Sequence, residues 1–161
     1  MRILVLSDSH GRNSNMWEVI ERVDADMLFH LGDSEDETEA IKERAGCPCE
    51  FVKGNCDYDR DLPDETVVDI GCHRAFLTHG HRYSVRFDLN ILADAAKEHG
   101  CDIAMFGHTH IPENVRVGGV DIYNPGSISL PRQDGRIPTF MVIDVDGKGE
   151  WHVTLNELKK R

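Results

Sequence analysis

Residues 3–11 read Ile-Leu-Val-Leu-Ser-Asp-Ser-His-Gly, so a run of four apolar residues ends in a polar cluster closed by a glycine. A short, continuous apolar run bounded by turn-forming residues predicts a buried strand. Four further runs are built in the same way, and each is followed by a cluster that combines glycine with Asp, Asn or His. The five predicted strands cover residues 3–6, 27–31, 51–52, 75–77 and 103–106.

Between these strands, apolar residues recur at the spacing that places them on one face of a helix. The three predicted helices cover residues 15–23, 35–45 and 89–99. Glycine follows the last two of them, as is common where a helix ends. The first hundred or so residues therefore alternate strand and helix.

After Gly107 the pattern changes to short apolar runs separated by turns rich in Gly, Asn and Pro. These predicted antiparallel strands cover residues 115–117, 120–123, 140–145 and 151–155. Alternation followed by hairpins predicts an α/β fold, a four-layer α/β/β/α sandwich of two mixed sheets, with the strand order undetermined. We expect one domain over residues 1–161, since a single domain commonly has about 100 to 200 residues.

The composition limits the partners and the compartment. With 18 Lys and Arg against 29 Asp and Glu, the formal net charge is −11, and an acidic surface repels a polyanion, so a nuclease is disfavoured. The first apolar run is too short for a signal peptide or for the roughly 20 residues that span a bilayer. The five cysteines, an odd number, fit free thiols, and we expect a cytoplasmic protein without membrane contact. The composition is compatible with a homo-oligomer.

The polar clusters carry the chemistry. The carboxyl ends of strands in an open α/β sheet meet at one crevice, so carboxylates and imidazoles are expected to converge there. Such a group is costly unless a cation neutralises it. Imidazole with carboxylate and amide oxygen suits Mn, Fe, Zn, Co or Ni better than Mg or Ca. The candidate ligands are Asp8, His10, Asp33, Asn55, His79, His108 and His110.

Seven ligands are too many for one ion and enough for two, provided that one carboxylate, for which we choose Asp33, bridges them. Two ions roughly 3.5 to 4 Å apart clamp a phosphoryl group and lower the pKa of a shared water. The predicted reaction is hydrolysis of a small phosphate ester by in-line attack of a hydroxide that bridges two divalent metals.

In this order, the five clusters resemble the signature of the calcineurin-like metallophosphoesterase superfamily, and Asn124 to Ser127 resembles its small YfcE-type phosphodiesterase branch. The resemblance covers about residues 2–132. It implies the four-layer sandwich, hydrolysis of phosphodiesters and frequent use of Mn. It also implies that Asp33 bridges two ions, one held by Asp8, His10 and His110, the other by Asn55, His79 and His108.

One position departs from this family. Many members have a histidine directly after the asparagine of the third motif, where it protonates the leaving group or holds the phosphate, and this chain has Cys56. A thiol is a weaker phosphate partner than imidazolium, so His81 is a candidate to serve instead. His81 is equally well interpreted as a partner that orients a metal ligand. The predicted catalytic residues are Asp33, Asn55, Cys56 and His81.

Several residues also have plainer interpretations. His30 lies inside an apolar run and is predicted to be a core histidine rather than a ligand. Glu35 and Asp36 are interpreted as charges at a helix N-terminus without a functional role. Arg12 and Arg82 could bind phosphate or lie in solvent. The rival for the whole chain is a non-catalytic scaffold, because the same superfamily includes a protein-binding subunit of retromer.

Overall fold

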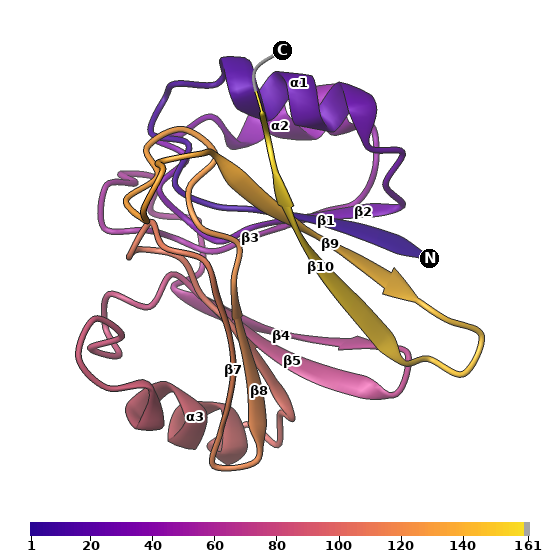
Figure 1. The fold of residues 1–161 in the computed structure, drawn as a ribbon, viewed down its shortest axis with the longest axis vertical. Coiled ribbons are helices and arrows are strands. Elements are labelled where there is room, and N and C mark those ends of the chain that lie inside the picture. The colour runs from indigo at the N-terminus through magenta and orange to yellow at the C-terminus, as the bar shows by residue number, and fades with distance from the viewer. Residues whose placement is uncertain (160–161) are drawn as a thin grey trace.

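The computed structural model describes residues 1–159, in which ten strands form two five-stranded mixed sheets (Figure 1). The first sheet has the order β10 (Trp151–Glu157), β9 (Thr139–Val145), β1 (Arg2–Leu6), β2 (Met27–His30) and β3 (Cys49–Phe51). The second has the order β4 (Glu65–Ile70), β5 (His73–Thr78), β6 (Ile103–Met105), β8 (Val120–Asn124) and β7 (Glu113–Val117). The helices are α1 (Ser14–Arg22), α2 (Thr38–Ala45) and α3 (Leu89–Glu98).

Three apolar layers hold these elements together. Side chains of both sheets, among them Val5, Phe29 and Met105, form the layer between the sheets. A second layer, with Met16 and Ile41, joins α1 and α2 to the first sheet, and a third joins α3 to the second sheet. The helices therefore cover the outer faces of two stacked sheets, which confirms the predicted four-layer sandwich (Figure 1).

The two terminal hairpins do not form a sheet of their own. In one, β8 pairs parallel with β6, which extends the second sheet. In the other, β9 pairs antiparallel with β1, which extends the first sheet. Each sheet thus combines three strands from the first part of the chain with one hairpin from the last part.

Two local predictions differ from the structure. Sequence patterns missed β4, because the apolar residues of this half-buried edge strand are interrupted by Glu65, Thr66 and Asp69 and form no long apolar run. The helix expected from residue 35 begins at Thr38, since Glu35 and Asp36 have positive φ angles of 56° and 65°. No helix within residues 1–159 is long and apolar enough to cross a membrane.

The strand directions place several loops at one edge of the sandwich. β1 and β2 run parallel in the first sheet, as do β5 and β6 in the second. The loops that follow these four strands therefore leave their sheets at the carboxyl ends, where ligands bind in α/β folds.

The core between the sheets sets the stability of the fold. We expect Phe29→Ala to lower the free energy of unfolding by about 3 to 5 kcal/mol, because Phe29 is fully buried and its loss leaves a cavity. The matched control is Phe87→Ala, since Phe87 is 89% exposed, and its effect should stay within about 0.5 kcal/mol. Urea denaturation measures both, and equal effects would contradict this account of the core.

Candidate metal centre

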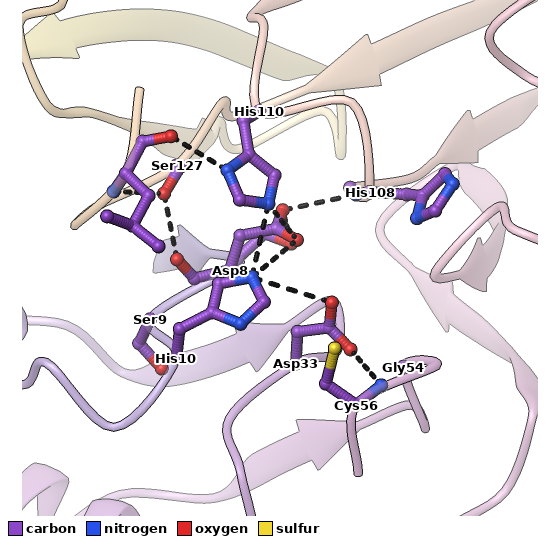
Figure 2. A network of polar contacts seen from close by, with 12 residues as sticks. Asp8, Ser9, His10, Asp33, Gly54, Cys56, His108, His110 and Ser127 are labelled. Carbon is purple, nitrogen blue, oxygen red and sulfur yellow. Dashed lines mark hydrogen bonds and ion pairs between the residues drawn. The ribbon is translucent and has the colours of Figure 1, made fainter. Parts of the chain in front are cut away.

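All seven predicted ligands lie at this edge, where they come from both sheets. Asp8 and His10 follow β1, Asp33 follows β2, and Asn55 follows β3. From the second sheet, His79 follows β5, and His108 and His110 follow β6. Figure 2 shows Asp8, His10, Asp33 and His110 pointing toward one another, whereas the ring of His108 points away from Asp8.

The first group of donors is Asp8, His10 and His110. The Nε2 atoms of His10 and His110 are 3.1 Å apart, and Nε2 of His110 is 3.3 Å from Oδ1 of Asp8. One ligand atom of each residue lies within 4.8 Å of the others. This spacing lets a single cation contact all three.

The second group surrounds Asn55. Its Oδ1 lies 3.1 Å from Nε2 of His79 and 3.0 Å from Nδ1 of His108. Oδ2 of Asp33 is 3.3 Å from Nε2 of His79 and 3.5 Å from Nε2 of His10. Asp33 therefore stands between the two groups, in the place that a bridging carboxylate needs.

Three of these histidines are oriented by acceptors on their outer sides. Nδ1 of His79 and of His110 each donate to a backbone carbonyl, that of Leu31 and of Leu130, at 2.7 Å. Nδ1 of His10 donates to a carboxylate oxygen of Glu35 at 3.0 Å. With the proton on Nδ1, the lone pair of each neutral ring is on Nε2, which faces the centre.

One buried carboxylate oxygen, on Asp8, indicates whether a cation would fit this centre. Oδ1 of Asp8 is buried and has no hydrogen-bond partner among the described residues. Around it lie Nε2 atoms of His10, His79 and His110, at 3.8, 3.9 and 3.3 Å. A buried carboxylate oxygen without a partner is costly, and a divalent cation would satisfy it together with the imidazole lone pairs. The donor set therefore fits a metal.

The pKa shifts at the centre have the same origin. Burial alone would raise the pKa of Asp8 and of Asp33, but the positive charge that the neighbouring histidines carry when they are protonated lowers both. Burial would likewise lower the pKa of His79, but Asp33 and Asp8 raise it. Two buried carboxylates thus favour positive charge between them, as protons or as a cation.

Much of the backbone at the centre is left-handed. Positive φ angles between 49° and 67° occur at Asp8, His10, Asp33, His108 and His110. This conformation costs roughly 1 to 2 kcal/mol for a residue with a Cβ, so the surrounding structure must hold it. Strain of this kind concentrates at functional sites.

Residues that the sequence analysis did not assign hold these loops. The carboxylate of Asp57 accepts from the backbone N–H groups of Asp33, Gly54 and Glu35 at 2.7 to 2.8 Å. Ser127 Oγ donates to the carbonyl of Asp8 at 2.8 Å (Figure 2). Both residues stand in motifs that the sequence analysis quotes, but the bond from Ser127 to Asp8 joins positions 119 residues apart, so neither motif by itself indicates it.

Glu35 is a correction to the sequence analysis. Instead of being a charge at a helix N-terminus without a functional role, it precedes α2, and its carboxylate accepts a hydrogen bond from the ring of His10.

Arg86 is a further residue that the sequence analysis missed, and its Nε donates to Nε2 of His108 at 3.3 Å. Its surroundings form a hollow of about 340 Å³ beside the centre, lined by Val85, Arg86, Phe106, Thr109, Ile111, Glu113 and Arg132.

The two candidate catalytic residues outside the ligand set both lie nearby. The backbone N–H of Cys56 donates to Oδ1 of Asp33 at 2.8 Å, and burial followed by the charge of Asp33 raises the pKa of its thiol to about 11. The ring of His81 lies 5.4 Å from that of His79 and 6.1 Å from that of His108. Burial, then the positive charge that His79 carries when it is protonated, lowers the pKa of His81.

The structure places His30 in the core, as its sequence context predicted. It is 1% exposed, its Nε2 is 3.1 Å from Oγ of Ser9, and its ring stacks on Phe51. Arg82 forms an ion pair with Asp64 at 2.9 Å and Arg12 is exposed, so neither is directed into the centre by a contact with a predicted ligand.

The fold and the donor set together match a known protein family. The chain belongs to the calcineurin-like phosphoesterase superfamily, whose domain model matches residues 1–148. The resemblance drawn from the five motifs is thereby confirmed. Membership supports a phosphoester hydrolase that uses divalent metal ions.

Two relatives carry related names. The probable metallophosphoesterase YsnB of Bacillus subtilis is 39% identical over 134 residues, which cover 82% of this chain and 78% of YsnB. The phosphodiesterase YfcE of Escherichia coli is 32% identical over 104 residues, which cover 59% of this chain and 52% of YfcE.

Solved structures share the whole fold. A protein of Streptococcus pneumoniae described as a predicted phosphoesterase has a TM-score of 0.79 and 29% identity, with 98% of this chain and 97% of that chain covered. Vps29 of Entamoeba histolytica, complexed with zinc, has a TM-score of 0.78 and 24% identity, with 98% and 99% covered. The likeness to Vps29 shows the fold alone.

Glu35 should matter through His10. We expect Glu35→Gln to weaken binding of Mn²⁺ by about 10- to 100-fold, because the ring of His10 loses the carboxylate that orients it. Calorimetric titration of chelator-stripped protein measures the affinity. Glu43→Gln on the exposed side of α2 is the matched control and should bind as the parent does. An unchanged affinity in Glu35→Gln would show that its contact does not orient the ligand.

His30 should make the stability depend on pH. Burial lowers its pKa from 6.5 to about 4, so below pH 6.5 the unfolded chain binds a proton that the folded chain does not. Stability from this residue is complete above pH 6.5 and falls as the pH drops, by about 3 kcal/mol at pH 4. Urea denaturation across this range should show that the parent loses stability more steeply than His30→Gln as the pH falls. Parallel curves for parent and His30→Gln would exclude this contribution.

Proposed function

We propose that this protein is a phosphodiesterase that hydrolyses small phosphodiesters at a pair of divalent metal ions. The observation that carries the proposal is the unpartnered Oδ1 of Asp8, toward which three imidazole Nε2 atoms face. No donor within the described residues satisfies this oxygen, and its surroundings are the ligand types that Mn, Fe, Co, Ni and Zn accept. Family membership supports the phosphoester substrate.

The two groups of donors support two sites with Asp33 in common. Asp8, His10 and His110 would hold one ion, and the second would be held by Asn55, His79 and His108. Asp33 would contact both, since its Oδ2 is within 3.5 Å of Nε2 atoms from each group. We propose Mn²⁺ as the ion in the cell, with Zn, Fe, Ni and Co as alternatives that the same ligands accept.

Such a pair of ions, when bound, would activate a water for attack and would offset the charge that develops on the phosphoryl group. The protein's part is to orient the ligands and to contact the substrate. His81, whose ring lies 6.1 Å from that of His108, would donate a hydrogen bond to a phosphoryl oxygen, and the Arg86 guanidinium beside His108 would attract an anionic group. With its pKa near 11, Cys56 stays a thiol and can offer only a weak hydrogen bond.

The surroundings of the centre favour a small substrate. The adjoining hollow of about 340 Å³ is large enough for a small organic group, and Arg86 and Arg132 line it. The net charge of −11 opposes a long polyanion. We therefore propose a small phosphodiester, with the non-leaving or leaving group in this hollow, rather than a nucleic acid.

The second candidate is a protein-binding scaffold of the same fold. Its support is the likeness to Vps29, a protein named for vacuolar sorting and not for an activity. Against it, all seven ligand positions of this chain hold metal-binding side chains, and Asp8, His10, Asp33, His79 and His110 bring their ligand atoms together in groups that could hold a cation. Hydrolysis is therefore the function that the geometry supports best.

Hydrolysis of a chromogenic phosphodiester separates the two candidates. Chelator-stripped protein should be inactive and should regain activity with Mn²⁺, and His110→Ala should lose at least about 100-fold, because a ligand contributes no less than the residues that orient it. His152→Ala, at an exposed position, is the matched control and should keep full activity. The matching monoester tests whether diesters are preferred. Absence of turnover with any divalent ion would favour the scaffold.

A further inference from the structure

A second cluster of metal-binding side chains lies at the opposite end of the strands. The turn between β4 and β5 contains Cys72 and leads into His73, and the turn between β9 and β10 contains Glu150. Both turns lie at the right of Figure 1, one from each sheet. The backbone N–H of Cys72 donates to the carbonyl of Gly149 at 3.0 Å, so the two turns are in direct contact.

This contact is close enough to require glycine. A Cβ on Gly71 would lie 2.2 Å from the carbonyl oxygen of Gly149, and one on Gly149 would lie 2.6 Å from the backbone nitrogen of Cys72. Both glycines also have positive φ angles, of 63° and 85°. The two turns are therefore fixed relative to each other, and so are the side chains that they carry.

Three donors of different chemistry meet there. Nε2 of His73 lies 3.0 Å from Oε2 of Glu150, and Sγ of Cys72 lies 3.3 Å from Oε1 of Glu150. All three side chains offer ligand atoms within 4.8 Å of one another. Zn–N and Zn–O bonds of about 2.0 to 2.1 Å and a Zn–S bond of about 2.3 Å place tetrahedral donors about 3.3 to 3.6 Å apart. The cluster is thus near the size of a single zinc ion's coordination shell.

The remaining nitrogen of His73 is also oriented. Its Nδ1 donates to Oδ2 of Asp102 at 2.6 Å, and Oδ1 of Asp102 accepts from the backbone N–H of Arg74 at 2.9 Å. The ring meets Trp151 edge-on, with the centroids 5.9 Å apart. A carboxylate that binds the outer nitrogen of a histidine fixes the other nitrogen for a metal, which is the usual arrangement around zinc-bound histidine.

We propose that Cys72, His73 and Glu150 bind a zinc ion, with water in the fourth position and Asp102 as the positioning residue. Thiolate, imidazole and carboxylate together are a ligand set that zinc accepts and that Mg²⁺ and Ca²⁺ do not. On binding, the Cys72 thiol releases its proton to solvent, as does His73 when it is protonated between its two carboxylates. The ion would join the β9–β10 hairpin of one sheet to the β4–β5 hairpin of the other.

Cobalt(II) in place of zinc tests the site, because a Co–thiolate bond gives a charge-transfer absorption in the near ultraviolet that nitrogen and oxygen ligands do not. Titration of the full chain should produce this band. Cys72→Ser, which alters an exposed residue, should abolish it and lower bound zinc by one equivalent per chain. Cys56→Ser, which removes a thiol at the other centre, is the matched control and should keep the band. No band in the parent, or a band lost only in Cys56→Ser, would overturn the proposal.

A second variant tests the positioning residue. Asp102→Asn should weaken zinc binding by about 10- to 100-fold while the cobalt band persists at saturation, because Asp102 orients His73 without contacting the metal. Asp94→Asn on α3 removes an exposed carboxylate elsewhere and should leave the affinity unchanged. Equal affinities for Asp102→Asn and the parent would show that the His73 ring is not positioned through Asp102.

Discussion

The arrangement around Asp8 depends on one electrostatic constraint. A buried carboxylate oxygen without a hydrogen-bond partner faces imidazole nitrogens whose protons are directed outward. Acceptors that meet in this way repel one another unless positive charge lies between them. The shifted pKa values of Asp8, Asp33 and His79 are responses to this constraint. Divalent cations would answer it most completely, which is why we propose metal-dependent hydrolysis for this geometry.

The rest of the structure holds this unfavourable group in place. Five ligand residues keep a left-handed backbone, which only a rigid surrounding can maintain. Three apolar layers supply that rigidity, because they fix the strands whose carboxyl ends carry the loops. Close to the centre, Asp57 and Ser127 bind backbone groups of the ligand loops. Burial in the core thus stabilises a site that would not form by itself.

The same physical device occurs at both ends of the sandwich. At the metal centre a carboxylate, Glu35, binds the outer nitrogen of His10, and at the opposite end Asp102 binds the outer nitrogen of His73. In each case the other ring nitrogen faces further metal-binding groups. The difference lies in softness, since the centre offers mainly nitrogen and oxygen, whereas the Cys72 cluster adds an exposed thiol. The two sites would therefore differ in their preferred ions. An ion at the second site would also join a hairpin of one sheet to a hairpin of the other.

The sequence by itself determined the class of fold and the seven converging residues, because apolar runs that end in polar glycine clusters are local patterns. It could not give the strand order or β4, since an edge strand needs no apolar run and pairing is decided by distant partners. Only the tertiary structure brought Glu35 to His10 and Ser127 to Asp8, across 25 and 119 positions of the chain. Contacts of this range depend on how the sheets stack, and no periodicity within a segment records them.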